Sequence, residues 1–418
     1  MRIILLTPYL FPHSNPRAHR WTAIAREWSR QGWEVHVVCS KYPGPVSGAG
    51  LDGLRVYRAG FNSAKEFVYR HFPAIPRRGA PGSGPAGNPL TSFLGRLNDW
   101  TLKPWYWPDD AWLWIRPAGT KAAHLLENGP WDALVTVSLP FSAHWVGLKL
   151  KKQFPKICWL ADIGDPFSLQ TEHPLNNLRL YRKKNEAAEK AVLKHADLVT
   201  VTNDGLAKAY RQMWPELKTP IHVIPPLASL PAVPSTQKPD PSGGLQFGYF
   251  GSFFKNIREP APLLEFFERL CLYNNDFTLH LYGEIFEHFR SVFDRYPSLK
   301  THLNFHGLVS REEAARAMLQ MDRLILLGNT TTFQLPSKWA DYLLSGKPVV
   351  HLVQTPEDPA LPLVKDQPNI LSLPLYEGNW DNILELFRSW KAPEGDGAIG
   401  AQRFSAAAVA DAYGDLLK

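Results

Sequence analysis

The feature that most constrains this chain is an alternation of short apolar segments with longer segments of helical spacing, which recurs in two series. Residues 2–7 and 34–39 are apolar, β-branched runs typical of buried parallel strands. Between them, residues 18–31 have helical spacing and end at Gly32, a suitable helix cap. A strand, a helix and a strand in this order form a right-handed βαβ unit. We therefore predict an α/β protein with doubly wound parallel sheets.

The two series define the predicted domains. The first series continues with strands at 133–137, 157–162, 198–202 and 221–224 and with helices at 142–153 and 178–195. The second has strands at 246–250, 277–282, 302–305, 323–327 and 348–353 and helices at 261–272, 285–294, 310–320 and 336–345. A Pro-rich segment with little apolar bulk lies between them. We predict an N-terminal domain at 1–228, a linker at 229–243, a C-terminal domain at 244–395 and a helical tail at 396–418.

The charge of the chain is unevenly placed. Its 418 residues carry a net charge of +7, but residues 1–229 have 29 Lys and Arg against 17 Asp and Glu, a net of +12, and the remainder has a net of −5. A basic half favours an anionic partner. No nucleic-acid-binding motif accompanies the charge, so we expect no nucleic acid and favour an anionic membrane surface or a lipid diphosphate. The alternative is that these cations only solvate helices.

The cysteines and the N-terminal segment bear on location. The three cysteines, Cys39, Cys158 and Cys271, are far apart and lack metal-ligand spacing, which fits a reducing, cytoplasmic compartment. The apolar start is broken by prolines and reads as a first strand, not as a signal peptide. No run of 18 apolar residues is present. We expect a cytoplasmic protein, with attachment to the inner face of the plasma membrane if its basic half meets anionic lipid.

The strongest local pattern is QLPSKWADYLLSGKPVV, residues 334–350. Pro336 suits the first turn of a helix, and Lys338 and Asp341 then share one helix face. With Ser337, a Lys at a helix start can bind a diphosphate, since free backbone N–H groups add to its charge. The Asp341 carboxylate can accept hydrogen bonds from ribose hydroxyls. The alternative is an amphipathic helix with a surface ion pair.

A second pattern lies at residues 249–264, YFGSFFKNIREPAPLL. The strand ends at Gly251, and the loop after it carries Lys255 and Arg258. Ligands bind at the carboxyl ends of such strands, and the planar guanidinium of Arg258 can grip a phosphate. We include these three residues in the predicted donor site. The alternative is a solvated loop with two unrelated cations.

A third pattern is WLADIGDPFS, residues 159–168, where Asp162 and Asp165 follow a buried strand. Asp165 precedes Pro166, so its backbone is held extended. Such a carboxylate can orient an acceptor hydroxyl or take its proton. The alternative is an aspartate that caps the next segment. The spacing is not that of a metal-binding Asp-x-Asp.

Two further segments carry candidates. The first strand–helix loop, residues 8–20, contains no glycine, but Arg17 and Arg20 are placed to reach a phosphate or the acceptor. The Trp-rich segment at 100–114 has two interpretations. It packs against the underside of the first domain, or some of its rings enter a membrane interface.

These stretches together resemble glycosyltransferase family 4. Residues 334–350 are similar to its Pro-x-Lys-x-x-(Glu/Asp)-Tyr-x-x-x-Gly-Lys-Pro-Val element. FGSFFKNIREPAPLLEFF resembles its strand–Gly–loop–Arg–helix element, and GWEVHVV its Gly-His-x-Val-x-Val pattern. DIGDPF and PDDAWLW resemble the Asp-x-Arg-Asp-Pro-Trp and Pro-Asp…Trp elements of one bacterial subgroup. The resemblance covers nearly the whole chain.

The resemblance implies a GT-B fold, two Rossmann-like domains facing across a cleft, and retaining transfer that needs no metal or other cofactor. Carried over by position, Arg258 and Lys338 stabilise the leaving diphosphate, Asp341 holds the donor ribose and Asp165 lies near the acceptor. We therefore predict an enzyme that moves a sugar from a UDP or GDP donor to a hydroxyl of a glycan, with a lipid-linked glycan favoured, in polysaccharide or cell-envelope biosynthesis.

The chain also departs from the family pattern. The first acid of the family's Glu-x7-Glu motif falls on Phe333, Gly164 stands where an Arg usually precedes Asp165, and the first loop lacks a Gly pair. Two alternatives therefore stay open. One is a soluble transferase that acts on a small natural product, and the other is an inactive GT-B protein that binds or scaffolds.

Overall fold

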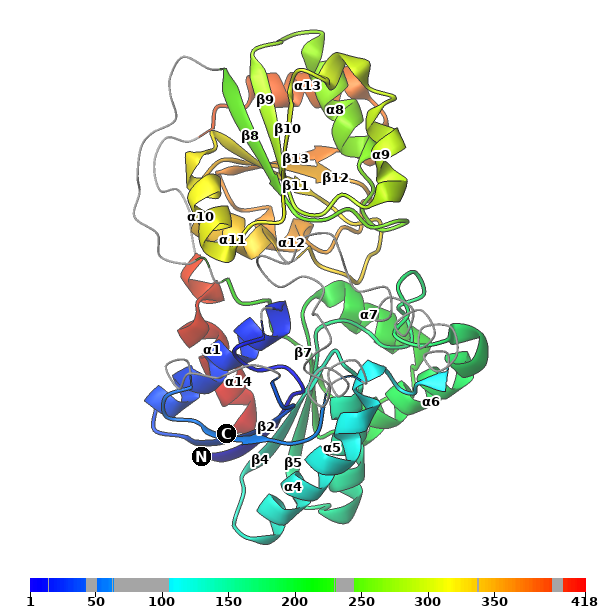
Figure 1. The fold of residues 1–418 in the computed structure, drawn as a ribbon, viewed down its shortest axis with the longest axis vertical. Helices are drawn as coiled ribbons and strands as arrows, with labels where there is room; N and C mark the ends of the chain where they lie inside the picture. Colours follow the sequence, from blue (N-terminus) through cyan, green and yellow to red (C-terminus); the bar gives the residue numbers. More distant parts are fainter. Residues whose placement is uncertain are drawn as a thin grey trace, which may run out of the picture. The chain divides into compact units, whose positions relative to one another are not determined.

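The computed structural model describes residues 1–13, 15–42, 51–61, 63, 105–228, 230, 244–336, 338–392 and 401–418. The chain forms two compact α/β units (Figure 1). Met1–Thr202, Ala207–Pro225 and Val409–Lys418 form the first unit, and Asn203–Leu206 and Pro226–Ala408 form the second. Of the predicted linker, only residue 230 is among the described residues, and Ser337 lies outside them.

The first unit is built on a seven-stranded parallel sheet with the order β3-β2-β1-β4-β5-β6-β7. The strands are β1 (Arg2–Leu6), β2 (Glu34–Cys39), β3 (Arg55–Arg58), β4 (Ala133–Ser138), β5 (Cys158–Ile163), β6 (Leu198–Val201) and β7 (Ile221–Val223). The order reverses between β1 and β4. In doubly wound sheets this reversal marks where ligands bind, outside the carboxyl ends of the strands.

Helices cover both faces of this sheet (Figure 1). On one face lie α1 (Pro16–Arg30) and α14 (Ala406–Leu417), and on the other lie α4 (Ile115–Glu127), α5 (Ser142–Gln153) and α6 (Leu178–His195). The 3₁₀ turn η3 (Asp110–Trp114) precedes α4, and α7 (Asp204–Met213) precedes β7. The Trp28 Nε1 donates to the Ala410 carbonyl at 3.0 Å, so the chain's last helix completes the face that α1 begins.

The second unit repeats the plan with six parallel strands in the order β10-β9-β8-β11-β12-β13. They are β8 (Leu245–Phe250), β9 (Phe277–Tyr282), β10 (Leu303–Gly307), β11 (Arg323–Leu327), β12 (Val349–Val353) and β13 (Ile370–Pro374). The helices and 3₁₀ turns are α8 (Ala261–Cys271), α9 (Glu287–Phe293), η4 (Pro297–Leu299), α10 (Arg311–Gln320), α11 (Lys338–Leu344), α12 (Leu361–Val364), η5 (Leu375–Glu377), α13 (Trp380–Ser389) and η6 (Ala401–Phe404). Here the order reverses between β8 and β11.

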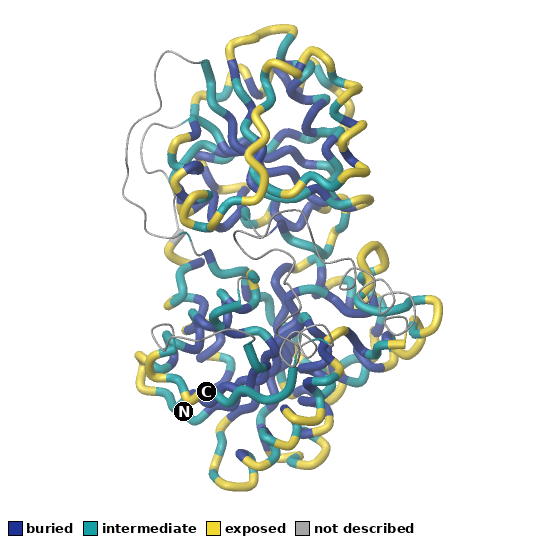
Figure 2. The backbone as a smooth tube through the Cα atoms, in the orientation of Figure 1, coloured by how far each residue is buried: buried dark blue, intermediate teal, exposed yellow. Residues whose placement is uncertain are grey.

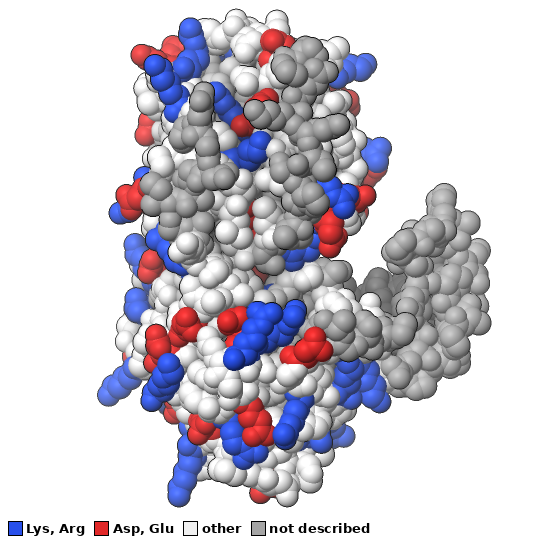
Figure 3. Space-filling model, turned by 90° about the vertical axis from the view of Figure 1, so that its left-hand side faces the viewer, with Lys and Arg blue, Asp and Glu red and all other residues white. Residues whose placement is uncertain are grey.

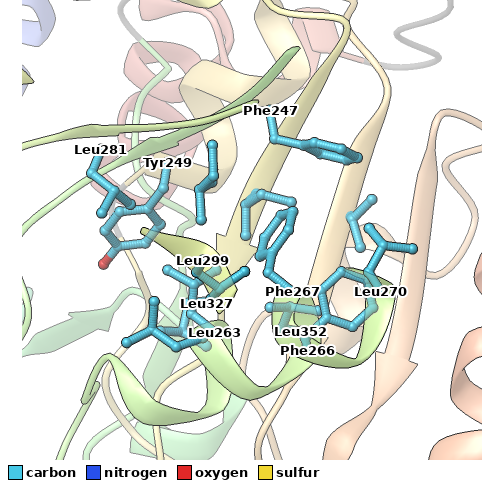
Figure 4. Close-up of a cluster of buried hydrophobic side chains, with 14 of the residues drawn as sticks. Phe247, Tyr249, Leu263, Phe266, Phe267, Leu270, Leu281, Leu299, Leu327 and Leu352 are labelled. Carbon is cyan, nitrogen blue, oxygen red and sulfur yellow. The ribbon is translucent and has the colours of Figure 1, made fainter. Parts of the chain in front are cut away.

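Apolar side chains fill both sides of the second sheet. The inner strands β8, β11 and β12 are largely buried, whereas the edge strand β10 is mostly exposed (Figure 2). One cluster packs Phe266 and Phe267 of α8 against Phe247 of β8 (Figure 4). A second cluster, on the other face, includes Met318 of α10 and Trp339 of α11. Each fully buried side chain of this size contributes about 1.5–3 kcal/mol, so the two clusters fix where the strand ends lie.

Candidate functional site

In the second unit, the ends of β8 and β9 are joined by a backbone hydrogen bond, and β8 is one of the two strands that flank the reversal. The Gly251 amide, just after β8, donates to the Tyr282 carbonyl at 2.8 Å. Gly283, just after β9, has φ +140, and a Cβ there would lie 2.3 Å from the Gly251 carbonyl oxygen. Glycine at position 283 is therefore required by both its backbone angle and the space available.

The loop after Gly251 holds Arg258 in a fixed position. The Phe254 amide donates to the Arg258 carbonyl at 2.8 Å and the Arg258 amide to the Phe254 carbonyl at 2.9 Å, which closes a tight turn. The half-buried guanidinium donates to the Ser252 carbonyl at 3.2 Å. Its Nε is buried and has no hydrogen-bond partner among the described residues. A buried donor on a charged group is costly when unpaired, so Arg258 is suited to an anionic ligand. Lys255, in the same turn, is exposed.

The loop after β11 is bonded to the Arg258 loop. The Thr330 amide donates to the Ile257 carbonyl at 2.8 Å, and its hydroxyl donates to the Asn256 carbonyl at 2.7 Å. Asn329 is buried, and its Nδ2 donates to the Gln334 carbonyl at 2.8 Å. The Asn329 Oδ1 has no partner among the residues described, so it can accept a hydrogen bond from a ligand hydroxyl.

Lys338 and Asp341 lie beside these two loops, at the start of α11. The Lys338 Nζ donates to Asp341 Oδ2 at 3.3 Å, with side chains 34% and 12% exposed. The Tyr342 hydroxyl accepts from the Phe250 amide at 3.0 Å, which ties α11 to the end of β8. Burial raises the pKa of Tyr342, and the charges of Arg258 and Asp341 both act on its hydroxyl. Arg258, Lys338 and Asp341 therefore gather around one strand end.

The charge at this site comes from side chains more than from a helix dipole. The helix begins at Lys338 and has only seven residues, so its dipole is small. Pro336 is buried just before it. A surface cavity of 940 Å³ lies at the other end of α8, lined by residues such as Glu268, Leu272 and His302, and contains none of the predicted residues.

In the first unit, Asp165 follows β5 and is paired with an arginine from the first turn of α1. The Arg17 guanidinium donates to Asp165 Oδ2 at 2.8 Å, with side chains 18% and 37% exposed. The structure thus brings together two residues that the sequence predicted separately. Asp165 keeps one carboxylate oxygen outside this bond, which can accept a hydrogen bond from an acceptor hydroxyl.

Asp162 and Arg20 lie instead in the interior of the first unit. Asp162 is 1% exposed and accepts from Trp21 Nε1 at 2.9 Å, Thr200 Oγ1 at 2.8 Å and the Tyr413 hydroxyl at 2.6 Å. Arg20 is 5% exposed and donates to the Tyr413 hydroxyl at 2.7 Å. Both side chains hold α1, β5 and α14 together. Asp162 and Arg20 are therefore not part of the proposed acceptor site.

The loop that carries Asp165 is held by Glu189 of α6, a residue that the sequence analysis did not select. Glu189 is buried and accepts from the Phe167 amide at 2.7 Å, the Ser168 amide at 2.8 Å and the Tyr210 hydroxyl at 2.5 Å. Burial raises the pKa of Glu189. In the sequence, Glu189 is marked only as an acid on the apolar side of a basic helix. This position indicates a buried, bonded acid once the fold shows what the helix packs against.

Asp109 fixes the start of α5 next to the same strand ends. It is buried and accepts from the Ser142 amide at 2.9 Å, the Ser142 hydroxyl at 2.6 Å and the Ala111 amide at 3.0 Å. Burial raises the pKa of Asp109 to about 6. The PDDAWLW segment therefore acts as a support for the helix that follows β4.

No group of three or more His, Cys, Asp and Glu side chains in the described ranges is arranged to hold a metal ion. Within the same ranges, no helix has the length and apolar character needed to cross a membrane.

Comparison with solved structures identifies the fold. Sucrose-phosphate synthase from Thermosynechococcus elongatus is 15% identical, with 99% of this chain and 98% of that chain covered and a TM-score of 0.64. HepE from Anabaena, solved with UDP and glucose, is 16% identical, with 100% and 99% covered and a TM-score of 0.57. The lipopolysaccharide outer core galactosyltransferase WaaB, in its apo form, is 13% identical, with 99% and 98% covered and a TM-score of 0.59. These likenesses confirm the predicted GT-B fold.

The sequence comparisons add the family. A search of curated protein sequences found no match. A family model described as a glycosyl transferase 4-like domain matches residues 18–226, half of the chain. The chain therefore belongs to the glycosyl transferase 4-like family and is a glycosyltransferase of the GT-B fold.

Proposed function

We propose that this glycosyltransferase moves a sugar from a nucleoside diphosphate sugar to a hydroxyl of a lipid-linked glycan, with retention of the anomeric configuration. One observation carries the proposal. Arg258 and the Lys338–Asp341 pair gather where the strand order of the second unit reverses, the position at which doubly wound sheets bind nucleotides. The structure of HepE with UDP and glucose supports a nucleotide donor of this kind.

In the proposed reaction, the bond between the anomeric carbon and the diphosphate oxygen breaks while a bond from that carbon to the acceptor oxygen forms. Arg258 and Lys338 stabilise the negative charge that develops on the leaving diphosphate. Asp341 accepts hydrogen bonds from the donor ribose. Because two cations neutralise the diphosphate, no metal ion is required.

The acceptor hydroxyl is oriented by Asp165. Carboxylates are weaker bases than phosphate groups, with ordinary pKa values of about 4 against about 6. We therefore propose that the proton of the attacking hydroxyl passes to the leaving diphosphate and that Asp165 aligns the acceptor by accepting a hydrogen bond from a neighbouring hydroxyl of the glycan.

Phe333 stands where the family has an acid, and we propose that another residue of the same loop makes the contact of that acid. Phe333 cannot make the polar contact that an acid in its position would make to the donor sugar. Asn329, four residues earlier, has a buried Oδ1 without a partner among the described residues. We propose that Asn329 accepts a hydrogen bond from a sugar hydroxyl in place of the missing acid.

The test is transfer from a panel of UDP- and GDP-sugars to a bacterial lipid extract and, separately, to small soluble alcohols, each with and without excess chelator. We expect a lipid-linked product that keeps the donor's anomeric configuration, at a rate unchanged by the chelator, and none from Arg258→Ala. Loss of transfer in the chelator that magnesium or manganese restores would exclude the metal-free proposal. Products formed only from soluble alcohols would favour a natural-product enzyme, and no turnover of any donor would favour a binding protein.

A further inference from the structure

The space beside Gly164 is filled by the side chain of another element. Gly164 lies between β5 and Asp165, and a Cβ built on it would lie 1.6 Å from Arg17 Nη1, 1.7 Å from Cζ and 1.8 Å from Nη2. The Arg17 guanidinium therefore occupies the volume that any side chain at position 164 would need. From there it donates to Asp165 Oδ2 at 2.8 Å.

The position of Arg17 is fixed by its helix. Asn15 caps α1, its Oδ1 accepting from the Ala18 amide at 2.8 Å. Trp21 lies four residues after Arg17, on the same helix face, and its buried indole donates to Asp162 at 2.9 Å. Arg17 and Trp21 thus reach Asp165 and Asp162, three residues apart at the end of β5. The buried Trp21 bond sets the register that brings Arg17 over Gly164.

The other side of Asp165 is also fixed. Glu189 accepts from the amides of Phe167 and Ser168, which immediately follow Asp165 and Pro166. The backbone of the loop is therefore held by α6, and the Asp165 side chain by α1. Since Asp165 is 37% exposed and no other ion pair to it is present among the described residues, Arg17 is the contact that selects its orientation.

We propose that Arg17 is the positioning residue of Asp165 and that any side chain at position 164 would displace the Arg17 guanidinium from Asp165. The subgroup element that DIGDPF resembles has an arginine at this position. In this chain the guanidinium beside Asp165 comes from α1. The role in transfer rests on the proposed function, whereas the packing of Arg17 over Gly164 does not.

The first experiment measures the packing without any substrate. Gly164→Ala should lower the unfolding temperature of the protein by roughly 2–4 °C, since the added methyl displaces the guanidinium. In an Arg17→Ala background the same change should have no effect, because the space is then empty. Gly119→Ala is the matched control: it lies in α4 of the same unit, where a Cβ would meet only Val146 Cγ1 at 3.8 Å. An equal loss from Gly164→Ala with and without Arg17 would overturn the packing proposal.

The second experiment measures the role in transfer, with the donor that the wild type turns over. Arg17→Gln and Gly164→Ala should each lower kcat about 100-fold, the cost of a misplaced reacting group, while UDP or GDP affinity stays within about twofold. Arg17→Lys, which keeps the charge, should lose less than Arg17→Gln. A kcat that is unchanged in Arg17→Gln, or a fall in nucleotide affinity equal to the fall in kcat, would overturn the role in transfer. A wild type that turns over no donor would refute the proposed function and leave the packing result to stand by itself.

Discussion

At the scale of single residues, burial divides the acids of the first unit between two roles. Asp109, Asp162 and Glu189 are buried, and each accepts three or more hydrogen bonds from neighbouring groups. Within the described ranges, Asp165 has one side-chain donor, Arg17, and its side chain is 37% exposed. Acids that are already saturated stabilise the fold, whereas an acid with an unoccupied, accessible oxygen can bind a substrate.

The pKa of Asp109 gives a test of this division. Burial raises that pKa from 3.8 to about 6, so the contribution of Asp109 to stability is full below pH 3.8 and is lost as the pH rises through about 6. The loss amounts to about 3 kcal/mol by the pKa difference. We therefore expect the unfolding temperature of the wild type, relative to that of Asp109→Asn, to fall between pH 4 and pH 7.

Calorimetric unfolding of the two proteins across this pH range checks the expectation. Asp110→Asn, which changes the exposed neighbouring acid, is the control and should follow the wild type. A wild-type advantage that grows with pH would show that Asp109 is stabilised as the ion.

The two aspartates near the end of β5 show what could not be predicted from the sequence. Asp162 and Asp165 look alike in the sequence, since both follow the same apolar strand. What separates them is the set of donors from Trp21, Thr200 and Tyr413, which are distant in the chain. Lys338 and Asp341 could be predicted because their spacing is local, within one helix.

At the scale of elements, the strands and helices with strong apolar periodicity were confirmed, among them β2, β9, β11 and α6. Other elements were not predicted from the sequence: β3, α4, α7, α12, β13 and α13. The β3 sequence RVYR is half polar, as expected at a sheet edge, and α4 contains a proline and a glycine in its first turns. These elements form because tertiary packing outweighs weak local preference.

The C-terminal helix shows that an element can serve a unit far from it in the sequence. Ser405 caps α14, its hydroxyl accepting from the Ala408 amide at 3.2 Å. The helix then places Tyr413 between Arg20 and Asp162. The last residues of the chain therefore hold together the two elements, α1 and β5, that carry Arg17 and Asp165.

Removing one hydroxyl from α14 tests this account. Tyr413→Phe should destabilise the first unit by about 1–3 kcal/mol, because it leaves a buried arginine and a buried carboxylate each short of a partner. Calorimetric unfolding measures the loss. Tyr376→Phe, at an exposed tyrosine of the second unit, should leave unfolding unchanged. Equal unfolding of Tyr413→Phe and the wild type would mean that the hydroxyl contributes nothing.

At the scale of the whole molecule, the distribution of charge bears on whether the protein meets its acceptor at a membrane surface or in solution. The face drawn in Figure 3 carries basic and acidic side chains interspersed. On α6, in contrast, Arg179, Arg182 and Lys183 are exposed beside the 52% exposed Leu180. The Tyr181 hydroxyl donates to the carbonyl of Trp105, a residue that is 67% exposed. Basic and aromatic side chains together are typical of surfaces that meet a membrane interface.

The structure also shows which basic residues of the first unit are available to contact a membrane surface. Lys151 lies in the basic stretch LKLKKQFPK, residues 148–156, and donates to Asp197 Oδ2 at 2.6 Å and to the Ile157 carbonyl at 2.7 Å. Trp114 is fully buried, as the packing interpretation of the Trp-rich segment expects, whereas Trp105 is exposed. The first half of α6 is therefore the best-supported candidate surface.

We predict that the protein binds anionic vesicles through this part of α6. Neutralising Arg179, Arg182 and Lys183 to Gln should weaken binding on the order of 100-fold at low salt, since each basic residue near such a surface contributes about 1 kcal/mol. Cosedimentation at low and high salt measures the effect. Neutralising the exposed Arg290, Arg295 and Lys300 of the second unit is the matched control. If the wild type fails to bind at low salt, an acceptor in solution becomes the better account.

The central claim is that the second unit binds a nucleoside diphosphate through Arg258 and Lys338, and isothermal titration of UDP and GDP tests it most directly. Arg258→Ala and Lys338→Ala should each weaken binding about 10- to 100-fold, the worth of one charge-assisted hydrogen bond. Arg269→Ala, at the far end of α8 and stacked on Trp380, should bind as the wild type does. Wild-type affinity in both site variants, or no binding of either nucleotide by the wild type, would contradict the account.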